Sequence, residues 1–197
     1  IDHKFEKNKY AIKKGHIVGY SGDTGGVSGP HLHFEIRNKN DQPVNPFKHS
    51  LSIQDNIYPI VRSIALIPLN RNSYINGISE EQVFIPKNIN EKIYILEDTI
   101  FVRGSIGIAI NAYDRITNQE FNYGIYSIDL LQNAEFIYSM QYDEINWENA
   151  SLIFTEKSYS LARKNQGKFY HLFSKNNNQS LPFINSKSQA GFIYDQF

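Results

Sequence analysis

Two histidines separated by one residue offer the clearest chemistry in this sequence. His31 and His33 lie in the stretch His31–Arg37, where polar and apolar residues alternate. On a β-strand this alternation places both imidazoles on one face, roughly 6 to 7 Å apart at the Cβ atoms. At that spacing one ring can bind a metal ion while the other handles a proton of the water at the open coordination position. An exposed histidine pair of this kind is also compatible with ordinary polar surface.

The elements around the pair are those that would have to position it. Residues 16–20 read as a short strand, and a glycine-rich loop over residues 22–30 separates it from the expected strand His31–Arg37. Glycine lets a backbone approach a substrate chain closely, so Gly25 and Gly29 are candidate substrate-binding positions. Turn-forming residues 38–46 close the unit.

The whole block resembles a known enzyme family. Residues 22–37 read GDTGGVSGPHLHFEIR, and Asn45 and Pro46 follow after a short turn. This is similar to the C-terminal active-site block of lysostaphin-type (LytM-like) zinc endopeptidases, which cut peptide cross-links in bacterial cell walls. The resemblance implies Zn²⁺ as cofactor, His33 as a zinc ligand and His31 as the catalytic histidine beside the metal-bound water.

One part of the family pattern is missing from this chain. The family takes two further zinc ligands from an upstream H-x-x-x-D block and another histidine from a strand between the blocks. The histidines that could begin such a block are followed four residues later by the wrong residue type: His3 by Lys7, His16 by Tyr20, His49 by Ile53 and His171 by Lys175. We therefore expect that this chain alone does not hold catalytic zinc tightly. It is either a fragment that begins partway through the peptidase domain, which its first residue Ile1 favours, or a degenerate member.

Composition narrows the remaining possibilities. The chain has 20 Lys and Arg against 20 Asp and Glu, so no net charge attracts a polyanion, and we expect no nucleic-acid partner. It has no cysteine, so a metal must use histidine and carboxylate ligands. No apolar run approaches the ~20 residues that span a bilayer, so no membrane span is expected. The oligomeric state stays open.

The residue types predict an all-β fold in two parts. The 13 Tyr and 13 Phe, with abundant Ile, suit pleated strands. By resemblance, residues 1–48 are the C-terminal portion of a peptidase β-sheet domain of the duplicated hybrid motif type. Residues 49–59 read as a linker. Residues 60–197 are predicted to form an immunoglobulin-like β-sandwich, possibly truncated, as in Bacteroidetes-type envelope peptidases. Its candidate strands include residues 61–69, 82–85, 106–113 and 135–140, and one short helix is expected near residues 159–164. Trp147 is expected to pack in its core rather than form a ligand platform.

Together these features predict a zinc-dependent endopeptidase that cleaves peptidoglycan peptides in the cell envelope, in the periplasm or as a secreted protein. The alternative is a catalytically inactive peptidase-like module that binds cell-wall peptides or regulates another hydrolase.

Overall fold

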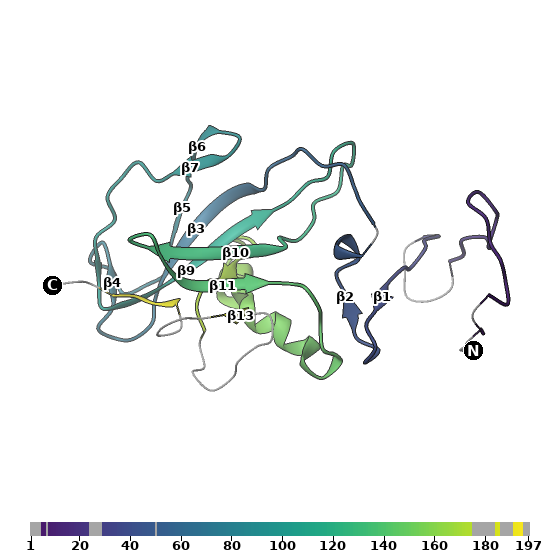
Figure 1. The fold of residues 1–197 in the computed structure, drawn as a ribbon. Coiled ribbons are helices and arrows are strands. Elements are labelled where there is room, and N and C mark those ends of the chain that lie inside the picture. The colour runs from purple at the N-terminus through teal and green to yellow at the C-terminus, as the bar shows by residue number, and fades with distance from the viewer. Residues whose placement is uncertain are drawn as a thin grey trace. The chain divides into compact units, whose positions relative to one another are not determined.

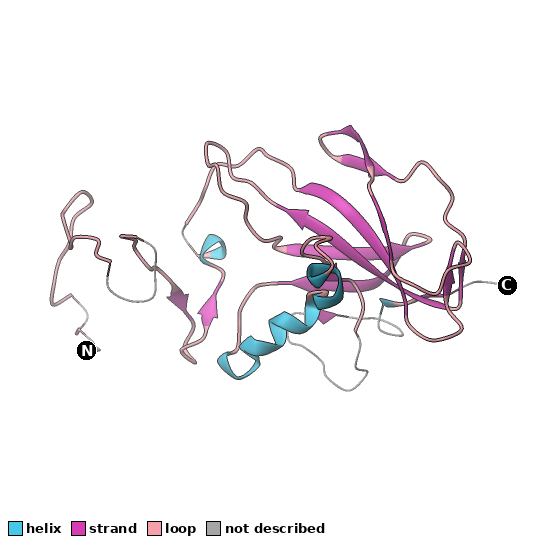
Figure 2. Ribbon diagram, turned by 180° about the vertical axis from the view of Figure 1, so that it is seen from behind, coloured by secondary structure: helices cyan, strands magenta, loops and turns pink. Residues whose placement is uncertain are grey.

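The computed structural model describes residues 5–6, 8–23, 29–49, 51–174, 184–185 and 191–194. The chain divides into two compact units, Ile1–Glu35 and Ile36–Phe197, here called unit 1 and unit 2. Strands make up most of the regular structure, so the predicted all-β class is confirmed (Figures 1 and 2). No helix among the described residues is long and apolar enough to cross a bilayer.

The described residues of unit 1 form turns and extended segments. A turn lies at Lys13–Gly15, with the His16 amide donating to the Lys13 carbonyl at 3.0 Å and Gly15 at a φ of 90°. The strand predicted for residues 16–20 is absent, and the one predicted for His31–Arg37 is regular only at β1 (Ile36–Arg37), which belongs to unit 2. An isolated bridge between Gly22 and His31 is the one described pairing of this region. The two sequence predictions were wrong because alternation forms a strand only where a partner strand completes the ladder.

Unit 2 contains two larger sheets. The five-stranded sheet has the order β12-β9-β3-β5, and β14 also pairs with β9. The three-stranded sheet has the order β10-β11-β13. All the described pairings are antiparallel. The bounds are β3 Ile60–Pro68, β5 Gln82–Phe84, β9 Ser105–Tyr113, β10 Ser127–Gln132, β11 Glu135–Gln141, β12 Tyr170–His171, β13 Ile184–Asn185 and β14 Ile193–Tyr194.

Three two-stranded pairs complete the sheet structure. They are β1 with β2 (Pro43–Val44), β4 (Tyr74–Ile75) with β8 (Val102–Arg103), and β6 (Lys87–Asn90) with β7 (Ile93–Ile95). Among the elements that the structure describes in full, the helical segments are η1 (Pro46–Lys48), η2 (Trp147–Glu156) and α1 (Tyr159–Arg163). The Ser158 hydroxyl accepts a bond from the Leu161 amide, which caps α1 at its N-terminus.

Strand β9 shows how the alternation of the sequence becomes a core. On one face, Ile108 and Ile110 pack with Tyr138, Met140 and Leu172, so that residues of both larger sheets meet, as Figure 1 shows for β9, β10 and β11. The opposite face carries Ala109, which lies opposite Ala65 of β3. These two small side chains form a cluster with the fully buried Leu161 of α1 and with Phe169. Each large apolar side chain buried in this way stabilises the fold by about 1.5 to 3 kcal/mol.

The predicted strands over residues 61–69, 82–85, 106–113 and 135–140 and the short helix near residue 159 are confirmed with shifts of a few residues at their ends. The immunoglobulin-like topology and the boundaries at residues 48 and 60 stay predictions. Residues 51–59 form no regular element, although Asp55 accepts hydrogen bonds from the amide and the hydroxyl of Thr117.

Candidate functional site

His31 is exposed, and its ring contacts its own loop. Its Nδ1 lies 3.2 Å from the carbonyl oxygen of Gly29. A carbonyl only accepts hydrogen bonds, so this contact requires the proton on Nδ1. The neutral ring then keeps its lone pair on Nε2, which can bind a metal or accept a proton from a water molecule.

His33 lies two residues further along the same extended segment. Its Nε2 is 4.0 Å from a carboxylate oxygen of Glu35, and the side chain of His33 is 77% exposed against 28% for Glu35. A carboxylate beside a histidine typically orients the ring when that histidine binds a metal. The pair therefore places one exposed imidazole beside one acidic group.

The described residues do not fit a complete zinc site. Catalytic zinc sites use three protein ligands and one open position. Across the part of the chain that the structure describes, no group of three or more histidine, aspartate or glutamate side chains is arranged to hold a metal ion. His171 lies in β12 and is buried in unit 2, with its Nδ1 3.4 Å from the Thr155 carbonyl.

Of the two candidate glycines, the structure describes one. Gly29 has a φ of 151°, a conformation that favours glycine, and an added Cβ would meet no atom within 4 Å. Backbone conformation, rather than crowding, therefore accounts for glycine at this position. Gly25 lies outside the described residues, and substrate binding by either glycine stays a prediction.

The end of the motif block is hydrogen-bonded to a distant part of unit 2, the loop of residues 143–147. The Asn45 amide donates to the Asp143 carbonyl at 2.7 Å, and the Ile145 amide donates to the Pro43 carbonyl at 3.0 Å. Val44 and Glu144 form an antiparallel bridge. The loop thereby extends the β1–β2 pair on the β2 side.

Side chains reinforce this junction. Lys48 Nζ lies 2.6 Å from Asp143 Oδ1, and the Tyr126 hydroxyl donates to the same oxygen at 2.5 Å. The Lys48 ammonium, with the Tyr126 hydroxyl and the Gln141 amide, lowers the pKa of Asp143 to about 2. Asp143 is therefore ionised at neutral pH and accepts all three bonds.

Trp147 takes part in the junction instead of the core. Its side chain is 53% exposed. Its Nε1 donates to the Asp41 carbonyl at 2.8 Å, and the Arg37 guanidinium lies 5.5 Å from the ring centroid. The predicted core position was wrong because Trp147 begins η2, where its indole N–H reaches a carbonyl on the turn between β1 and β2. No local pattern signals this contact, since Asp41 and Trp147 are separated by 106 residues.

Sequence comparison finds a similarity in the N-terminal part of the chain. The model of peptidase family M23 matches residues 3–46, so these residues are similar to part of an M23 peptidase domain. Two curated relatives, the proteins named DD-carboxypeptidase/endopeptidase Mpg of Neisseria meningitidis serogroup B and Neisseria gonorrhoeae, are each 43% identical over 47 residues. No solved structure matches the chain significantly.

These matches cover little of each protein. The aligned region is 24% of this chain and 11% of each relative. The M23 segment, residues 3–46, contains His31 and His33, so the predicted relation to LytM-type peptidases is confirmed at the level of the family. The boundary between the two units falls inside the segment, after Glu35, and its last residues are those held by the loop of residues 143–147.

Proposed function

We propose that this chain carries part of a zinc-dependent endopeptidase that cleaves the peptide cross-links of bacterial peptidoglycan. The observation that carries the proposal is the intact His31-x-His33 block inside a segment that matches peptidase family M23. The relatives' names, which combine carboxypeptidase and endopeptidase, support a peptide-hydrolysing activity. Such a substrate places the protein in the cell envelope, either in the periplasm or secreted.

The two histidines have different roles in this proposal. His33 is a zinc ligand, and the bound metal would polarise the scissile carbonyl. His31, with its proton on Nδ1, uses Nε2 to accept a proton from the attacking water and to pass it to the leaving amine. Gly25 and Gly29 let the substrate backbone approach. Since the described residues lack two of the three zinc ligands, we propose that an H-x-x-x-D block outside these 197 residues supplies them.

The test compares this chain with the product of its complete reading frame. Zinc content is measured by mass spectrometry, and cleavage is measured on cross-linked muropeptides. We expect the complete product to bind one zinc ion and to cleave, and this chain alone to do neither. His33→Ala should abolish zinc binding and cleavage, whereas His31→Ala should keep the zinc and lower the cleavage rate roughly 10²- to 10⁴-fold.

His49→Ala is the matched control, because His49 is an exposed histidine outside the histidine block. It should retain both zinc and activity. If the complete product binds no zinc and cleaves no muropeptide, the endopeptidase proposal fails.

The shortage of metal ligands favours a second candidate function. A catalytically inactive M23-like module would bind cell-wall peptides or regulate another hydrolase. It predicts that the complete product binds muropeptides without cleaving them, and that His33→Ala leaves this binding unchanged.

A further inference from the structure

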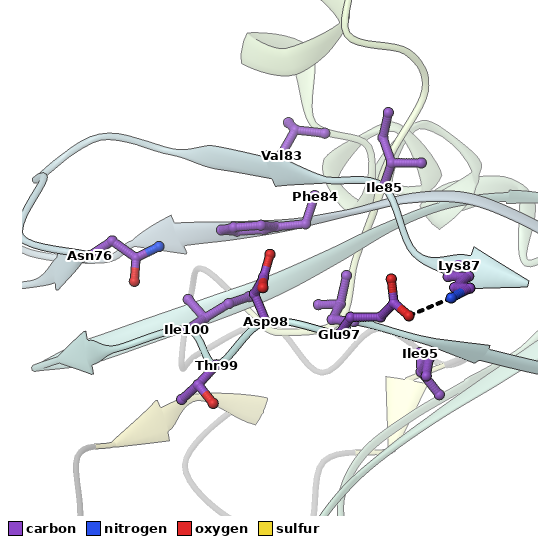
Figure 3. Close-up of a pocket in the computed structure, with 11 residues that line it drawn as sticks. Asn76, Val83, Phe84, Ile85, Lys87, Ile95, Glu97, Asp98, Thr99 and Ile100 are labelled. Atoms are coloured by element: carbon purple, nitrogen blue, oxygen red, sulfur yellow. Dashed lines mark hydrogen bonds and ion pairs between the residues drawn. The ribbon is translucent and has the colours of Figure 1, made fainter.

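Unit 2 contains a pocket that the peptidase chemistry does not use. It has a volume of about 450 Å³ and lies between β5 with the start of β6 and the segment from Ile95 to Ile100 (Figure 3). This volume falls in the range of small-ligand sites, roughly 300 to 1,000 Å³. All its lining residues belong to unit 2, at a distance in sequence from the M23 segment.

The apolar part of the pocket is supported by the core. Phe84 and Ile100 line the pocket and pack against the buried cluster of Leu66, Ile75 and Ile106. At the rim, Ile85 is 84% exposed and Ile95 is 41% exposed. A surface held from behind by fixed side chains costs little conformational entropy when a ligand binds. An aliphatic chain can therefore contact Phe84 and Ile100 in a pocket that is already formed.

The polar groups of the pocket give it a charge preference. At one end, Lys87 Nζ lies 2.5 Å from Glu97 Oε1, so these two charges neutralise each other (Figure 3). At the other end, the Asn76 side-chain oxygen accepts a bond from the Phe101 amide at 2.9 Å. Asp98 lies between them, and Figure 3 shows its carboxylate directed toward the Phe84 ring. No ion pair to Asp98 is formed among the described residues, which leaves the pocket with one net negative charge.

An apolar floor with one carboxylate beside it complements an aliphatic chain that ends in a cation. We propose that this pocket binds the side chain of a lysine-type diamino residue in a cell-wall peptide, with its methylene groups on Phe84 and Ile100 and its ammonium group at Asp98. The preference of the pocket for a lysine-type side chain is argued from its geometry alone. That this side chain belongs to a cell-wall peptide rests on the proposed function. The second unit would then hold a strand of peptidoglycan while the M23 segment takes part in cleavage.

The test measures peptide binding to this whole chain by NMR chemical-shift changes, without zinc. The probes are acetyl-Ala-Lys-Ala-amide and the same peptide with norleucine, which keeps the aliphatic chain and lacks the ammonium group. We expect the lysine peptide to bind with a Kd of about 1 mM, a value that one side-chain pocket can supply. The norleucine peptide should bind about fivefold more weakly, and 0.5 M salt should remove most of this difference.

Variants locate the effect at the pocket. Asp98→Asn should bind both peptides equally, at the affinity of the norleucine peptide. Asp129→Asn is the matched control, because Asp129 is an exposed carboxylate on β10 that does not line the pocket, and it should keep the fivefold preference. Circular dichroism checks that both variants remain folded.

Three results would overturn the proposal: no binding of either peptide, equal affinity for both, or a preference for lysine that survives in Asp98→Asn. None of these results bears on cleavage, which the His31→Ala and His33→Ala variants test separately. Conversely, loss of the peptidase proposal would leave binding of the lysine side chain intact and remove only the cell-wall assignment.

Discussion

Unit 1 and unit 2 differ in what their apolar side chains contact. In unit 1, Val18 is 78% exposed and Leu32 is 85% exposed, and none of its described residues is buried. In unit 2, residues such as Ala65, Ile106 and Leu161 are at most 1% exposed, and they belong to buried apolar clusters: Ala65 and Leu161 to one, Ile106 to another. The two histidines of the M23 segment lie in the unit whose described residues form no core, whereas unit 2, which has a core, contains only the end of that segment.

This difference shows that a sequence carries two kinds of information, one on local motifs and one on the packing of a core. A catalytic motif is local, so the sixteen residues 22–37 already carry a resemblance to the family whose model matches residues 3–46. A core is non-local, because it forms only when strands distant in sequence supply the opposite face. The alternation of Leu32 and Phe34 with His31 and His33 is therefore a strand pattern that needs a second surface to cover its apolar face. Measurements of stability should separate the two units in the same way.

The largest difference is expected for a matched pair of leucine truncations. Leu161→Ala removes a side chain that is 1% exposed and packed on Ala65, Ala109 and Phe169, and should lower the free energy of unfolding by about 2 to 5 kcal/mol. Leu32→Ala removes a side chain that is 85% exposed and should change it by less than about 0.5 kcal/mol. Urea titration followed by tryptophan fluorescence measures both. Equal effects would show that unit 1 has a packed core after all.

A pair of glycine substitutions tests crowding in the same two units. A Cβ on Gly107 in β9 would lie 2.5 Å from the ring of the buried Phe173, so Gly107→Ala should destabilise the protein by about 1 to 3 kcal/mol. A Cβ on Gly19 would meet nothing within 4 Å, and Gly19→Ala should be neutral within about 0.5 kcal/mol. Thermal unfolding at one pH compares the two. A neutral Gly107→Ala would mean that the Phe173 ring moves aside without cost.

The smallest effect is a dependence of stability on pH that originates in unit 2. Burial lowers the pKa of Lys157 to about 8 from an ordinary 10.5, although Glu156 beside it acts in the opposite direction, and its ammonium group lies over the Tyr170 ring. At a pH between these two pKa values, Lys157 is protonated in the unfolded chain and has lost its proton in the folded chain. Unfolding therefore takes up a proton, and this residue's contribution to stability rises with pH.

Lys157→Met should accordingly stabilise the protein by about 1 kcal/mol at pH 7, and this gain should shrink as the pH approaches 10. Lys13→Met, at an exposed lysine of unit 1, serves as the control and should show no such trend. Urea titrations of the wild type and both variants at pH 7, 8.5 and 10 give the comparison. If the difference in the free energy of unfolding between the wild type and Lys157→Met is constant across this pH range, Lys157 is not the source of the pH dependence.

Much of unit 2 could be predicted from the sequence because its elements are regular. The alternation in Ser105–Tyr113 indicated β9, and the short run Tyr159–Arg163 indicated α1, whose cap is Ser158. The ten-residue segment η2 was not predicted, since its 3-10 geometry lacks the periodicity of an α-helix. Pairings of short strands such as β4 with β8 were also missed, because two residues carry too little pattern to indicate a partner.

The residues of the candidate site could be predicted from the sequence, but the contacts that position them could not. Its histidines were identified through the M23 block, whereas the contacts that hold the end of that block come from Asp143 and Trp147, about a hundred positions away. Nothing near Asp41 or Lys48 in sequence indicates those partners. The pocket at Asp98 was missed for the same reason, since Phe84 and Asp98 meet only through the fold.

The junction between residues 36–48 and the loop of residues 143–147 also bears on how such proteins diverge and recombine. The last part of the motif, from Ile36 onward, belongs to unit 2 and is hydrogen-bonded there to the loop of residues 143–147, so an exchange of segments cut at the end of the motif would sever these bonds. A chimera joined after Glu35 keeps these bonds within one parental sequence. The structural boundary at this place is thus offset from the end of the segment that the family model matches, and we expect chimeras joined after Glu35 to fold more often than chimeras joined after residue 46.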